Sequence, residues 1–106
     1  MPVPHHKLVR DRIPEIIRAD GGHPVTRVLD QASYRQALLD KLVEEAREAA
    51  SASPASLPEE LADVLEVLRA LIQAESISWE QLRALADDKR NHRGGFTGKI
   101  FLESVD

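Results

Sequence analysis

The sequence contains no cysteine, which excludes a disulfide framework and a thiolate metal site. Any bound metal must therefore be held by oxygen or imidazole ligands. Long apolar runs are also missing, and the start Met1–His6 has no hydrophobic signal core. These absences predict a soluble cytoplasmic protein that does not engage a membrane.

Aromatic residues are scarce, whereas alanine, leucine, glutamate and arginine, which all favour helices, are abundant. The net charge of -4 argues against electrostatic binding to nucleic acid, which requires a basic surface. A length of 106 residues fits one domain that spans 1–106. Because so small a chain buries a limited share of its surface, we expect a homo-oligomer, either a dimer or a dimer of dimers.

Apolar periodicity, caps and breaks predict four helices, over residues 7–20, 31–50, 57–75 and 79–92. Ser56–Glu59 has the form of a capping box that opens the third helix, and Ser78 is the expected cap of the fourth. Segments 23–29 and 99–102 are the expected strands of an optional two-stranded β element. We predict an all-α fold in which the two long helices form an antiparallel hairpin, and two hairpins build a four-helix-bundle core on dimerisation.

Acidic residues lie where the two long helices should face each other. At about 100° per residue, Glu45 falls roughly 20° from Leu38 on the apolar stripe of its helix, and Glu48 falls roughly 80° away. On the next helix Glu60 lies inside the apolar arc and Asp63 just beyond it. The break between the helices is short, so both acidic pairs should lie at similar heights. Carboxylates gathered in a partly dry cleft repel one another unless protons or a cation neutralise them, and such hard oxygen ligands suit Mg²⁺ or Mn²⁺.

A solvated acidic face is the plainer interpretation of Glu44, Glu45 and Glu48, since glutamate is an ordinary helix former. Their position near a helix C-terminus weakens that interpretation, because the macrodipole disfavours negative charge there. Glu59 is explained by the start of its helix. Spacing alone leaves the solvated face and the metal site both open.

Two acidic motifs resemble a known signature. Glu44-Glu45-Ala46-Arg47-Glu48 and Glu60-Leu61-Ala62-Asp63 are similar to the EExxE and ExxD motifs of the all-α nucleoside triphosphate pyrophosphohydrolases, the superfamily of MazG and phosphoribosyl-ATP pyrophosphohydrolase. The flanks Lys7–Pro14 and Lys89–Phe96 resemble the small phosphoribosyl-ATP pyrophosphohydrolase-like members. The resemblance extends over nearly the whole chain, although the segment between the two motifs is short for the superfamily.

The resemblance implies magnesium-dependent hydrolysis of a nucleoside triphosphate or nucleotide-like triphosphate, giving the monophosphate and pyrophosphate. By position it implies four metal ligands, which are Glu45, Glu48, Glu60 and Asp63. Glu44 would orient or deprotonate the attacking water, unless a metal-bound hydroxide makes a separate base unnecessary. Housecleaning of unwanted nucleotides and a step resembling histidine biosynthesis both remain open.

Phosphoryl chemistry also requires positive charge around the phosphate oxygens, and basic residues gather near both ends of the chain. The candidates for substrate binding are Lys7, Arg10, Arg12, Lys89 and Arg93. Local ion pairs on a helix surface are the alternative for any one of them. Trp79 and Tyr34 are expected to pack in the core or in a subunit interface rather than to stack on a base.

The competing class of function is a non-catalytic helical module whose acidic cleft binds a metal or a basic partner. Such a module turns over no triphosphate. Magnesium binding would not separate the two classes, whereas turnover would.

Overall fold

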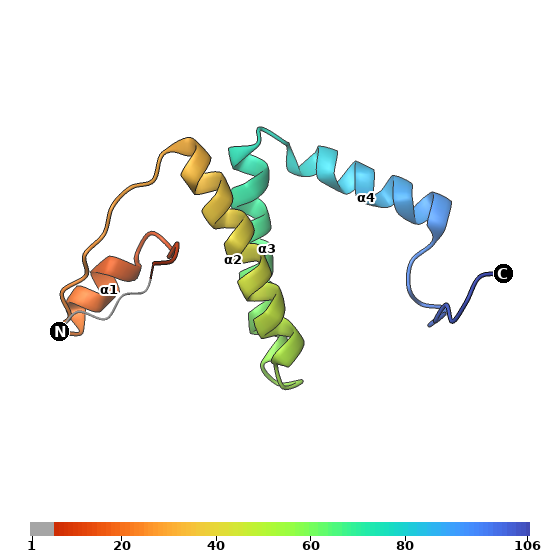
Figure 1. Cartoon of the computed structure of the whole chain (residues 1–106), viewed down its shortest axis with the longest axis horizontal. Coiled ribbons are helices and arrows are strands. Elements are labelled where there is room, and N and C mark those ends of the chain that lie inside the picture. The colour runs from red at the N-terminus through yellow and green to blue at the C-terminus, as the bar shows by residue number, and fades with distance from the viewer. Residues whose placement is uncertain (1–5) are drawn as a thin grey trace.

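The computed structural model describes residues 6–106, which form four helices joined by non-helical segments (Figure 1). The helices are α1 (Ile13–Ala19), α2 (Gln31–Ser51), α3 (Leu57–Ala74) and α4 (Trp79–Arg93). The predicted all-α fold is confirmed. Residues 1–5, on which the expected absence of a signal segment partly depends, lie outside the described residues. Within residues 6–106, no helix combines the length and the apolar character that crossing a membrane requires.

The long helices α2 and α3 pack side by side as a hairpin, and their contact forms the core (Figure 1). Leu38 on α2 is only 2% exposed, and Val67 on α3 is 7% exposed. Two polar contacts join the open end of the hairpin. The Arg35 guanidinium pairs with Glu75, and the Gln31 amide donates a hydrogen bond to the carbonyl of Ala74.

The two long helices begin at Gln31 and Leu57, as predicted, but α3 begins without the expected cap. Asp30 caps α2, because its Oδ1 accepts a hydrogen bond from the N–H of Ser33 at 2.8 Å. This hydrogen bond lowers the pKa of the Asp30 carboxyl. The capping box expected at Ser56–Glu59 is wrong, because a capping residue needs extended backbone and Ser56 already has helical angles. Ser53 turns the chain instead, since its carbonyl accepts from the N–H of Leu57 at 3.0 Å.

The first helix is shorter than predicted. It begins at Ile13 rather than Lys7, and Pro14 lies in its first turn, where the missing N–H of proline is tolerated. The preceding residues form a turn in which the N–H of Ile13 donates to the carbonyl of Arg10 at 3.0 Å. No residue of α1 is buried, so this helix lies beside the core rather than within it.

The expected β element is wrong, because residues 23–29 and 99–102 form no strand. The two segments lie at opposite ends of the molecule, since α4 carries the C-terminal segment away from α1 (Figure 1). Val25, Val28 and Ile100 are consequently 96%, 98% and 91% exposed.

Helix α4 projects away from the hairpin (Figure 1). Ser78 caps it as predicted, and the cap is a complete capping box. The Ser78 Oγ accepts from the N–H of Gln81 at 3.1 Å, and the Gln81 Oε1 accepts from the N–H of Ser78 at 2.8 Å. The radius of gyration is 18.1 Å, whereas about 13 Å is typical of a compact chain of this size. The elongated shape leaves apolar side chains of α4 and of the C-terminal segment uncovered.

Candidate metal centre

Three carboxylates converge between α2 and α3 near the closed end of the hairpin. Glu45, Glu60 and Asp63 each offer one oxygen, and these oxygens lie within 4.8 Å of one another. Glu45 belongs to the last two turns of α2, whereas Glu60 and Asp63 are three residues apart at the start of α3. The antiparallel hairpin places the end of one helix beside the start of the other, which brings the acids together.

The burial of these carboxylates makes the cluster energetically unfavourable when no cation is bound. Glu45 is only 7% exposed. One oxygen of Glu45 is 3.3 Å from the Lys41 ammonium, but its Oε2 and the Oε2 of Glu60 are buried without a hydrogen-bond partner. Unpartnered buried carboxylate oxygens are strongly unfavourable, and a divalent cation would satisfy them. The all-oxygen donor set therefore fits Mg²⁺ or Mn²⁺.

Glu48 lies at the edge of the cluster and is itself exposed. The pKa of its carboxyl is raised, first by the negative charge of Glu45, then by loss of hydration and by hydrogen bonding to Glu45. The charge of Glu60 raises this pKa further. Glu48 is thus close enough to the other acids to repel them, although it is outside the tight group of three.

Glu44 occupies a different position from the three converging acids. Its carboxylate is 3.4 Å from the Lys41 ammonium, and its side chain is 36% exposed. Lys41 thus contacts both Glu44 and Glu45 from one turn earlier on α2. The catalytic role of Glu44 stays a prediction, and its carboxylate is accessible to solvent.

Of the five basic candidates, Arg10 reaches the carboxylates. Its guanidinium is 2.7 Å from Oδ1 of Asp63, so the N-terminal segment lies against the start of α3. Lys7 and Arg12 belong to the same segment and are exposed. Among residues 6–106, neither of these two forms an ion pair with the acids.

The structure does not bring Lys89 and Arg93 to the carboxylates of the same chain. Both residues lie on α4, which leaves α3 at the end of the hairpin opposite the acids (Figure 1). At 1.5 Å per residue, Ala74 is already about 16 Å along α3 from Asp63. The remaining length of α4 then leads further away.

No family model matches the chain, and no solved structure matches it. An uncharacterized protein of Mycolicibacterium smegmatis is 57% identical to it over 42 residues. This similarity covers 40% of the chain and 43% of the relative, so the chain matches less than half the length of that protein.

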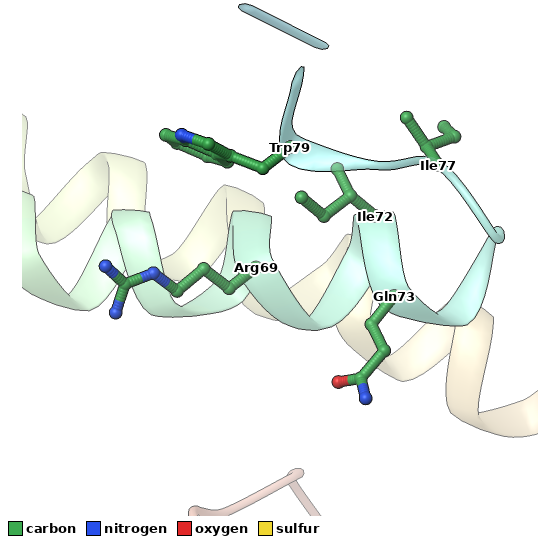
Figure 2. Close-up of a pocket in the computed structure, with 5 residues that line it drawn as sticks. All are labelled: Arg69, Ile72, Gln73, Ile77 and Trp79. Carbon is green, nitrogen blue, oxygen red and sulfur yellow. The ribbon is translucent and has the colours of Figure 1, made fainter. Parts of the chain in front are cut away.

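A surface hollow at the junction of α3 and α4 was not expected from the sequence. It has a volume of about 350 Å³, and Figure 2 shows the side chains that line it, which are Arg69, Ile72, Gln73, Ile77 and Trp79. Trp79 lies over α3 beside Ile72, and it is 39% exposed rather than enclosed in the core of this chain. No residue of the carboxylate cluster lines the hollow.

Proposed function

We propose that the protein is a magnesium-dependent pyrophosphohydrolase, which cleaves a nucleoside triphosphate or a nucleotide-like triphosphate to the monophosphate and pyrophosphate. The observation that carries this proposal is the convergence of Glu45, Glu60 and Asp63 around two buried oxygens that lack a partner. The resemblance of the two acidic motifs to the EExxE and ExxD signature supports the type of reaction.

The four carboxylates Glu45, Glu48, Glu60 and Asp63 would hold the metal. When bound, Mg²⁺ or Mn²⁺ supplies positive charge that offsets the charge of the phosphate oxygens. Glu44 accepts a proton from the attacking water or orients it, because it adjoins the cluster and stays accessible. Arg10 is placed to contact phosphate oxygens, since its guanidinium already lies at the edge of the cluster.

We also propose that two hairpins pack as a homodimer in the cytoplasm. A single hairpin buries few side chains, and Leu38 and Val67 are the only buried apolar residues in the described part of the chain, residues 6–106. Val43 is 49% exposed on the hairpin, and it is available for packing in a four-helix core. The cysteine-free sequence is suited to a reducing compartment.

Turnover tests the proposed function. The purified full chain is incubated with Mg²⁺ or Mn²⁺ and a panel of canonical and modified nucleoside triphosphates together with phosphoribosyl-ATP, and pyrophosphate release is measured. We expect release from at least one of these substrates, and none when EDTA is added. Metal binding without turnover of any substrate would instead support a non-catalytic module.

Arg10→Ala should tighten the binding of Mg²⁺, because the metal would no longer compete with the guanidinium for Oδ1 of Asp63. The two side chains are 57% and 42% exposed, so their ion pair contributes less than about 1 kcal/mol. The Kd for Mg²⁺ should therefore fall by no more than about fivefold. Calorimetric titration of the wild type, Arg10→Ala and the control Arg12→Ala measures this. Weaker binding by Arg10→Ala than by the control would contradict the competition.

A further inference from the structure

Helix α4 and residues 94–106 form an arm that has little contact with the rest of the chain (Figure 1). The arm carries large apolar side chains that are between 59% and 97% exposed. These residues are Leu85, Phe96, Ile100, Phe101, Leu102 and Val105. Their exposure indicates that the arm packs against another molecule.

The total surface of the chain supports this conclusion. Its accessible area is 9606 Å², whereas a compact protein of 11.8 kDa exposes about 5,900 Å². The excess of roughly 3,700 Å² is several times the area that each partner buries in a standard interface, which is about 800 Å². An excess of this size is comparable to the area that obligate homodimers and permanent complexes bury.

One stretch of the arm is basic, although the acidic and basic residues of the whole arm balance. Between Lys89 and Lys99 the chain carries four lysines and arginines and no acidic residue. Leu85, Lys89 and Arg93 follow one another at intervals of four, so they project from one face of α4. That face therefore combines an apolar residue with two cations.

The hairpin offers the complementary surface. Leu57 and Leu61, at 37% and 53% exposure, lie on α3 beside Glu60. The buried Oε2 of Glu60 lacks a partner, and Asp63 follows one turn later. An apolar strip next to a carboxylate cluster matches the exposed apolar side chains and the basic stretch of the arm.

The junction with α3 directs the arm away from its own hairpin. The N–H of Ile77 donates to the carbonyl of Ile72 at 2.8 Å, and Trp79 lies over Ile72 (Figure 2). The capping box at Ser78 then starts α4 in its observed direction. In this arrangement the cations of α4 can reach a carboxylate cluster only in another copy.

We propose that the arm docks on the hairpin of a second copy of this chain, where Phe96 covers the exposed leucines of α3 while Lys89 and Arg93 lie beside its carboxylate cluster. The docking needs no catalysis. Its consequence, that the second copy supplies positive charge for the phosphates, rests on the proposed function. This arrangement accounts for basic residues that are remote from the acids within one chain.

Cysteine pairing tests the docking without any activity measurement. The chain has no cysteine, so Leu61→Cys and Phe96→Cys are introduced into separate full-length proteins, which are mixed, allowed to exchange subunits and oxidised. Both positions are exposed, at 53% and 97%, so neither substitution disturbs the core. We expect most of the mixture to become a covalent dimer that contains one chain of each variant, and reduction should reverse the link.

The matched control replaces Phe96→Cys by Arg83→Cys, because Arg83 lies about 160° from Leu85 around α4. This control should give at least tenfold less mixed dimer. Equal yields with both partners, no mixed dimer, or a monomeric wild type in light scattering would overturn the proposal. An internally linked monomer formed by the double variant Leu61→Cys/Phe96→Cys in place of a dimer would also overturn it. Because none of these readouts involves turnover, an inactive protein that forms the mixed dimer would overturn the proposed function alone.

Discussion

Asp63→Asn should lower kcat/KM for pyrophosphate release by at least about 100-fold, which is the scale of losing a group that stabilises charge in the transition state. The amide keeps the size of the side chain but removes one of the three charges whose oxygens lie within 4.8 Å. It also frees Arg10 from its ion pair. Because Asp63 is one of the proposed metal ligands, the loss should appear mainly as a higher Mg²⁺ concentration at half-maximal rate. Initial rates at increasing Mg²⁺ concentration measure both effects.

Glu66→Gln is the matched control for this substitution. Glu66 lies three residues further along α3, is 48% exposed in its side chain and pairs only loosely with Arg69 at 3.8 Å. Its amide variant should retain activity within about twofold, because exposed ion pairs of this kind contribute little. Full activity in Asp63→Asn, or equal losses in both variants, would exclude the carboxylate cluster as the site of reaction.

Leu38→Ala should lower the free energy of unfolding by about 2–5 kcal/mol, which is the usual cost of truncating a fully buried leucine. Leu38 is the most buried residue of the hairpin at 2% exposure. The loss is a large share of the stability of a small protein, which is roughly 5–15 kcal/mol. Urea denaturation at one fixed protein concentration measures it, since association would also contribute to stability.

Val43→Ala provides the comparison on the same helix. Val43 is 49% exposed, so its truncation should cost less than about 1 kcal/mol within the hairpin. A similar loss for Val43→Ala at a protein concentration at which the chain is monomeric would mean that Leu38 is not at the centre of the core. A loss for Val43→Ala that grows with protein concentration is instead what the proposed homodimer predicts, because that dimer covers Val43.

The hairpin was predictable because its signals are local. The apolar spacing around Leu38 specifies one face of α2, and the break near Ser53 limits how the two helices can connect. Once the helices are antiparallel, the position of Glu45 relative to Glu60 follows from the helical period. The sequence was therefore sufficient to predict how the carboxylates are arranged. It was not sufficient to establish that they bind a metal or catalyse a reaction.

Other features depend on competing hydrogen bonds or on the position of a segment in the fold, which a local sequence pattern does not reveal. Ser56 has the sequence of a cap, but the turn made by Ser53 had already given it helical backbone angles. Residues 99–102 have the composition of a strand, yet α4 carries them far from any edge with which they could pair. The direction of α4 is specified by the hydrogen bond between Ile77 and Ile72 and by the packing of Trp79 at the end of α3. The sequence did not signal the geometry of this helix end, because Ser76 takes the left-handed conformation, with a φ of 56°, that glycine usually supplies.

Identification of the products by phosphorus NMR is the most direct measurement of the proposed reaction at the carboxylate cluster. The wild-type chain is incubated with Mg²⁺ and the triphosphate that it cleaves fastest. We predict that monophosphate and pyrophosphate resonances grow in equal amounts and stop growing when EDTA is added. Formation of diphosphate and orthophosphate, or no product from any triphosphate in the panel, would contradict cleavage between the α- and β-phosphates by this protein.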